Sequence, residues 1–140
     1  MGRIELKSRE EIKWMREVGL VVADIHRSLR EAARPGITTR ELDAVSAQAI
    51  RRAGATSNFL NYAGYPATVC ISINDVVVHG IPGERTLEEG DLVSFDCGAW
   101  VSRNGREWHG DAAFSMIVGD EWIPDEEFAQ GKRAHGAAPG

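Results

Sequence analysis

Apolar residues in the first part of the chain recur at intervals of three and four, which is the period of an amphipathic helix. Ser8 and Glu11 have the spacing of a capping box, in which each side chain bonds to the other residue's backbone, and Pro35-Gly36 follows the run. The sequence therefore predicts a helix of about 25 residues between these signals. Its apolar face contains Ile12, Met15, Gly19, Val22, Ile25, Leu29 and Ala32.

A second, shorter helix is predicted between Thr38 and Gly54. Thr38 and Glu41 repeat the capping-box spacing, and Gly54 supplies a helix stop. The apolar positions of this helix are Leu42, Val45, Ala49 and Ile50. Residues 55–67 are rich in Asn, Gly, Tyr and Pro, so we predict a loop or irregular strand there.

The apolar period changes to two after Ala67, which is typical of β-strands. Three turn signals, at Asn74-Asp75, Pro82-Gly83 and 87–91, separate the strand-like runs. We predict two helices followed by an antiparallel sheet, hence an α+β fold. The predicted strands are Val69–Ile73, a strand beginning at Val76–Val78, Leu92–Cys97 and Trp108–Val118.

The composition is that of a soluble globular domain: 140 residues, 43% apolar and 26% charged. Residues 124–140 carry one large apolar side chain, Phe128. We therefore expect residues 1–120 to form one domain and residues 121–140 to be a disordered tail.

The net charge of −5 argues against a nucleic-acid surface, which is usually basic. No apolar run is long enough to cross a membrane, and the first residues do not have the pattern of a secretory signal. The two cysteines, Cys70 and Cys97, are far apart and in no paired-ligand pattern. We expect a cytoplasmic protein in a reducing environment, without a nucleic-acid or membrane partner.

Asp96 and Asp111 are the first candidates for chemistry, because both lie on strand-like segments that we expect to be half-buried. Burying a charge without a partner costs on the order of several kcal/mol, so a buried carboxylate needs a neighbouring group or ion that stabilises it by a similar amount. Two facing carboxylates would repel unless a cation lay between them, and oxygen ligands suit Mn, Fe(II), Co or Zn. The alternative is that both are turn aspartates at strand ends.

Two histidines lie near these aspartates in the sequence. His79 precedes Gly80-Ile81-Pro82 and could point into a cleft, where it would transfer a proton or bind a metal. The alternative is an exposed loop histidine. His109 could bond to a metal ligand as a supporting group, or be a simple strand residue.

An aromatic cluster precedes the first predicted strand. Phe59, Tyr62 and Tyr65 could form the wall of an apolar pocket, and Cys70 could line it. Alternatively, these rings anchor the loop onto the core.

Three stretches of the chain resemble type I methionine aminopeptidases. Asn61–Pro82 resembles their substrate-pocket and catalytic-histidine segment, Gly90–Ala99 the segment with their first aspartate ligand, and Trp108–Ala113 the segment with their second. The match runs from about Ile4 to about Gly119. The resemblance implies half of a pita-bread fold, which has two similar α+β halves around two divalent metal ions. It also implies removal of methionine from the amino termini of nascent proteins.

The family's residue roles are carried over to the matching positions. By resemblance, Asp96 chelates one metal, Asp111 bridges both, and His79 contacts the scissile amide. The residues implied to form the methionine pocket are His79, Tyr62, Tyr65 and Cys70, with Phe59 at its edge.

The sequence departs from the family in three places. The aspartates are separated by residues 97–110, a longer spacing, and we expect the extra residues of Val101–Glu107 to form a longer loop with both aspartates still facing inward. Ala63 stands where a histidine is usual. The family's second half, with a histidine and two glutamates as further ligands, is missing from the sequence.

This third departure leads us to expect a truncated chain with weak or no activity alone, and an apolar patch where the second half would pack. The alternatives are a half-domain that completes its site as a homodimer, or a non-catalytic domain that binds peptides or proteins.

Overall fold

The computed structural model describes residues 6–75 and 80–119. The predicted strand at 76–78, His79 and the predicted tail at 121–140 lie outside the described residues, so those predictions stay untested.

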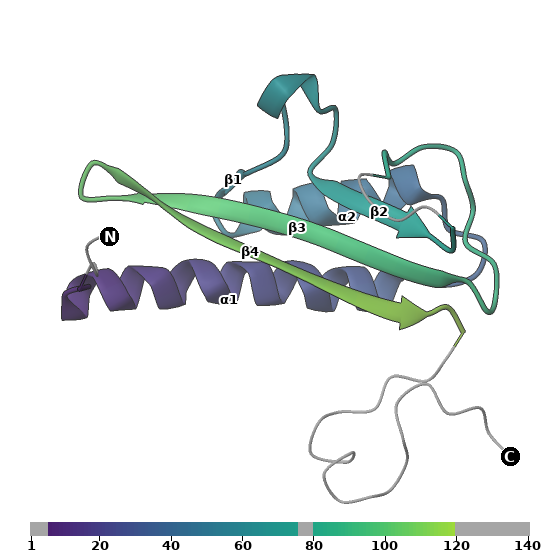
Figure 1. The fold of residues 1–140 in the computed structure, drawn as a ribbon, viewed down its shortest axis with the longest axis horizontal. Helices are drawn as coiled ribbons and strands as arrows, with labels where there is room; N and C mark the ends of the chain where they lie inside the picture. The colour runs from purple at the N-terminus through teal and green to yellow at the C-terminus, as the bar shows by residue number, and fades with distance from the viewer. Residues whose placement is uncertain (1–5, 76–79, 120–140) are drawn as a thin grey trace, which may run out of the picture.

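Both predicted helices are confirmed (Figure 1). Helix α1 spans Arg9–Ala32 and begins with the predicted capping box, in which Ser8 Oγ accepts from Glu11 N at 3.1 Å and Ser8 N donates to Glu11 Oε1 at 3.0 Å. Helix α2 spans Thr39–Arg52, and Thr38 Oγ1 accepts from Glu41 N at 3.1 Å. Neither helix, within the described residues, is of the length and apolarity needed to cross a bilayer.

The strands form one antiparallel sheet centred on β3 (Leu92–Arg103). One edge of β3 pairs with β1 (Thr56–Ser57) and β2 (Val69–Ile73), and the other pairs with β4 (Arg106–Ile117). A short 3-10 helix, η1 (Tyr62–Gly64), lies in the loop between β1 and β2 and stands away from the sheet in Figure 1. The α+β prediction is confirmed.

The hairpin between β3 and β4 corrects the prediction of a longer loop. The turn contains only Asn104 and Gly105, with φ of 53° and 70°, and both strands continue up to it. Asn-Gly favours this tight turn because both residues tolerate positive φ. The extra residues therefore lengthen the two strands, and Arg103 pairs with Glu17 of α1 to hold the tip against the helix.

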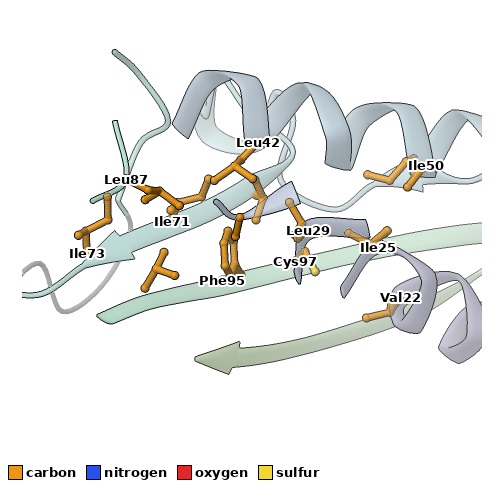
Figure 2. Close-up of a cluster of buried hydrophobic side chains, with 14 of the residues drawn as sticks. Val22, Ile25, Leu29, Leu42, Ile50, Ile71, Ile73, Leu87, Phe95 and Cys97 are labelled. Atoms are coloured by element: carbon orange, nitrogen blue, oxygen red, sulfur yellow. The ribbon is translucent and has the colours of Figure 1, made fainter. Parts of the chain in front are cut away.

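Alternate residues of β3 form the core between the sheet and the helices. Val93, Phe95, Cys97 and Ala99 are fully buried, and Figure 2 shows Phe95 and Cys97 among side chains from both helices. Because side chains alternate along a strand, the residues between them lie on the opposite face, away from the helices. That face, here called the open face, carries Asp96, Gly98 and Trp100.

Candidate metal centre

The strand register places Asp96 and Asp111 on the same face of the sheet. Asp96 pairs with Ala113 and Gly98 pairs with Asp111, so each aspartate lies two residues along its strand from the other's partner. Residues paired across antiparallel strands share a face, as do residues two apart. Both aspartates therefore lie on the open face, as diagonal neighbours.

The two aspartates differ in exposure. Asp96 is half-buried, as predicted, because β3 has neighbours on both sides. Asp111 is exposed, so the prediction of half-burial was wrong for this residue. The reason is that β4 pairs only with β3, and among the described residues no strand lies along its outer edge.

The two carboxylates are suitable ligands for a divalent cation, but they are only part of a complete ligand set. Their oxygens are hard donors, and their placement on one face lets a cation lie near both. Within residues 6–75 and 80–119, no group of three or more His, Cys, Asp or Glu side chains is arranged to hold a metal ion. A complete site needs ligands from outside these residues.

A pocket of about 430 Å³ lies beside Asp96. It brings together Asp96 and all four of the described residues that the sequence assigned to substrate binding. Tyr62 is at its exposed side, with 76% of its surface accessible, and Phe59 and Tyr65 meet edge to face at 6.2 Å between ring centroids. The pocket is lined by Phe59, Tyr62, Gly64, Tyr65, Pro66, Cys70, Ile81 and Asp96.

The Tyr65 hydroxyl fixes one wall of this pocket. It lies 3.1 Å from Val69 O and 3.2 Å from Gly80 O, so it can donate to either carbonyl and ties the loop to β2 and to the segment beside it. Burial raises the pKa of Tyr65, and a hydrogen bond with Cys70 raises it further. The hydroxyl is therefore neutral near pH 7.

The two cysteines lie on opposite faces of the sheet. Cys70 pairs with Asp96 across β2 and β3 and lines the pocket, whereas Cys97 points into the core. Burial raises the pKa of the Cys70 thiol, and the nearby negative charges of Asp96 and Asp111 act in the same direction. An uncharged thiol suits an apolar pocket and makes a nucleophilic role for Cys70 unattractive.

The edge of the pocket is apolar and exposed. Of the residues that line the pocket, Tyr62 and Ile81 expose 76% and 63% of their surface. Leu60, in the same loop as Tyr62, exposes 46%. Exposed apolar side chains are typical of surfaces that pack against another segment.

Sequence reasoning missed Asn58, which reaches across the open face. Its Nδ2 donates to Gly110 O at 3.2 Å, and its Oδ1 lies 2.9 Å from His109 Nδ1. The other ring nitrogen of His109 lies 3.1 Å from Glu107 Oε2. The signal that could have found this contact is Gly98, because a glycine inside a strand often marks a close approach.

The model of metallopeptidase family M24 matches residues 13–136 of the chain. Methionine aminopeptidase 1 of Mycobacterium tuberculosis is 46% identical over 128 residues, which is 91% of this chain and 47% of that protein. Methionine aminopeptidase 1 of Bacillus subtilis is 42% identical over 121 residues, with 86% and 46% covered. The chain thus spans about half the length of the curated relatives it matches.

Solved structures give the same result. The methionine aminopeptidase of Thermotoga maritima superposes with a TM-score of 0.73 at 33% identity, over 84% of this chain and 46% of that one. The Rickettsia prowazekii methionine aminopeptidase gives 0.74 at 30% identity, over 91% and 50%. A prolidase from Pyrococcus horikoshii, 21% identical with a TM-score of 0.62, shares the fold.

Proposed function

The chain belongs to metallopeptidase family M24, and from this we propose that it carries one half of a methionine aminopeptidase active site. The proposal assigns it two metal-binding carboxylates and the pocket for a methionine side chain. Together with the remaining ligands, this site would remove methionine from the amino termini of new proteins in the cytoplasm. The observation that carries the proposal is that Asp96 lines the same pocket as Phe59, Tyr65 and Cys70.

Asp96 and Asp111 would hold the divalent cations, which by resemblance are two per site and drawn from Mn, Fe(II), Co or Zn. The diagonal placement of the two carboxylates on the open face supports this role. When bound, such cations polarise a carbonyl and lower the pKa of a bound water toward neutrality.

The pocket would select the amino-terminal side chain. Its rings and the neutral Cys70 thiol offer apolar and polarisable surface, which suits a thioether. Because Asp96 lines the same space, a methionine side chain in the pocket would bring its own backbone groups beside the metal-binding carboxylate. The same cavity would thus select the methionine side chain and position the peptide backbone beside Asp96.

His79 is proposed as the group that contacts the scissile amide. It lies outside the described residues, so this role rests on the resemblance alone. Its neighbour Gly80 accepts a hydrogen bond from Ile71 N at 2.9 Å, beside the pocket.

The remaining ligands are proposed to come from a segment that corresponds to the second half of the relatives, in the same polypeptide or in a partner. The exposed side chains of the pocket residues Tyr62 and Ile81, and of Leu60 in the same loop as Tyr62, support this. Retention of both aspartates favours a metallopeptidase over a non-catalytic binding domain.

The decisive experiment joins residues 1–119 to the second half of the Bacillus subtilis relative. We expect the chimera to bind Mn(II) and hydrolyse a Met-Ala-Ser peptide, and to lose hydrolysis with Asp96→Asn or Asp111→Asn. Glu107→Gln is the matched control, because it removes one charge from β4, the strand that contains Asp111. A folded, Mn(II)-bound chimera that leaves Met-Ala-Ser intact would contradict the proposal.

A further inference from the structure

We propose that Asn58 is a positioning residue of the metal centre, which holds the strand segment before Asp111 and so keeps Asp111 beside Asp96. The inference rests on the proposed function, since the position of Asp111 matters for catalysis only if the two aspartates bind cations. It assigns Asn58 no contact with substrate or metal.

Three hydrogen bonds attach Asn58 to strands β3 and β4. Its backbone N donates to Gly98 O of β3 at 3.0 Å, and its side-chain Nδ2 donates to Gly110 O of β4 at 3.2 Å. Because the amide NH₂ is used on Gly110, the oxygen Oδ1 is the acceptor, and His109 Nδ1 donates to it at 2.9 Å. One side chain thus bonds to both residues that precede Asp111.

Gly98 provides the path for this side chain. A Cβ at Gly98 would overlap Asn58 Nδ2 and lie 2.9 Å from Gly110 O. Since Gly98 pairs with Asp111, the Asn58 amide crosses β3 in the row of the sheet that contains Asp111. This crossing requires that position 98 have no side chain.

Asp111 needs such support because it lies exposed on an edge strand. On the helix side, Gly110 packs so closely on α1 that a Cβ there would lie 3.1 Å from Val22 Cγ2 and 3.3 Å from Val18 O. On the open side, Asn58 bonds to the carbonyl of the same residue. Gly110 is therefore held from both faces, and Asp111 follows it directly.

The same residue couples the pocket to the carboxylates. Asn58 is bonded covalently to Phe59, a pocket residue, and Ser57 Oγ accepts from Phe59 N at 3.1 Å. A shift of Asn58 would move the pocket wall relative to Asp111. Groups that fix a ligand's orientation without binding the metal typically contribute about tenfold or more to metal affinity.

The test compares Asn58→Leu and Asn58→Ala with Ser115→Ala in the full 140-residue chain. Leucine keeps the branched shape of the Asn58 side chain, is somewhat larger, and cannot make its side-chain hydrogen bonds. Ser115→Ala is a matched control, because Ser94 Oγ and Ser115 Oγ lie 2.7 Å apart and join the same two strands. The readouts are the Mn(II) dissociation constant, from the electron paramagnetic resonance signal of free Mn(II), and hydrogen exchange of residues 108–113 without metal.

We expect both Asn58 variants to weaken Mn(II) binding about tenfold and to raise exchange at 108–113, while leaving α1 and α2 protected. Ser115→Ala should leave the Mn(II) affinity unchanged. Wild-type affinity in folded Asn58→Leu, or equal weakening by Ser115→Ala, would overturn the inference.

A separate comparison isolates the proposed function. If the wild-type chain shows no Mn(II) binding that Asp96→Asn removes, the metal-binding proposal fails for this chain. The exchange experiment then decides the positioning role: raised exchange at 108–113 in Asn58→Leu supports it, and unchanged exchange overturns it.

Discussion

Asp111 pairs across the sheet with Gly98, two residues along β3 from Asp96, so the two carboxylates are diagonal neighbours on the open face. Diagonal positions in an antiparallel pair lie roughly 7–8 Å apart, close enough for two carboxylates to share one or two cations. In the absence of a cation, two negative charges at this spacing repel. The proposed metal binding and the fold stability are therefore coupled through this pair.

Asp111→Asn should separate the effect of charge repulsion on stability from the effect of metal binding. Without divalent metal, the variant should melt at the same temperature as wild type or higher, because one of two repelling charges is gone. With added Mn(II), the melting temperature should rise for wild type and stay unchanged for the variant. Circular dichroism melts with Mn(II) and with a chelator measure both.

Glu107→Gln is the control for Asp111→Asn, since it removes a charge from the same strand away from Asp96. It should keep the Mn(II)-dependent rise. An equal loss of that rise in both variants would contradict the assignment of Asp111 as a ligand.

Tyr65→Phe tests the wall of the pocket. The variant loses the hydroxyl that lies within reach of Val69 O and Gly80 O, and a lost hydrogen bond of this kind costs about 1 kcal/mol. Urea denaturation should show a lower unfolding free energy with an unchanged m-value. Tyr62→Phe is the control: Tyr62 is 76% exposed, and its replacement should leave stability as it is.

The elements of the fold followed from local signals. The Ser8–Glu11 capping box and the apolar period gave α1 to within a residue at its start, because caps and periodicity are properties of neighbouring residues. The tight Asn104-Gly105 turn was also readable locally, yet the resemblance to a shorter family pattern favoured a longer loop instead. The preference of Asn-Gly for a tight turn therefore determined the hairpin, and the comparison with the family's shorter spacing was misleading.

Only part of the candidate site could be predicted from the sequence. The resemblance led us to expect that Asp96 and Asp111 face the same way, but the exposure of Asp111 depends on β4 being an edge strand, which is a property of the assembled sheet. Asn58 lies 52 residues from Gly110 in sequence. Its contact depends on the register between β3 and β4, which no local pattern around Asn58 specifies.

The core thiol of Cys97 makes stability depend on pH. Burial, reinforced by the charges of Asp96 and Asp111, raises the pKa of Cys97 to about 12. In the unfolded chain the pKa of a cysteine is about 8.5, so above that pH only the unfolded state loses the proton. The contribution of this group to the unfolding free energy should therefore be constant below about pH 8. Between pH 9 and 10 it should fall by up to about 1.4 kcal/mol per pH unit.

Urea denaturation at a series of pH values measures this slope. The pKa of Cys70 is also raised by burial, so it contributes with the same sign. The double variant Cys70→Ala, Cys97→Ala should have a flatter profile between pH 8 and 10, whatever its absolute stability. An equally steep fall in the double variant would assign the effect to other groups.

Gly80→Ala should damage the pocket and the fold together. A Cβ at Gly80 would overlap Ile71 O and lie 2.7 Å from Ile71 C, and these backbone atoms of β2 cannot move aside. The segment would have to leave β2, which breaks the bond from Ile71 N to Gly80 O and displaces Ile81 from the pocket. We expect a loss of about 2 kcal/mol or more in unfolding free energy, measured in urea.

Gly83→Ala provides the comparison for Gly80→Ala. A Cβ at Gly83 would meet no atom within 4 Å, and this glycine is not among those with positive φ. The same substitution three residues along the same segment should therefore change stability little. In the chimera, Gly80→Ala should also raise the KM for Met-Ala-Ser, because Ile81 lines the pocket that we propose takes the methionine side chain. If both alanine variants behave alike, the close approach of Gly80 to β2 is not what shapes the pocket.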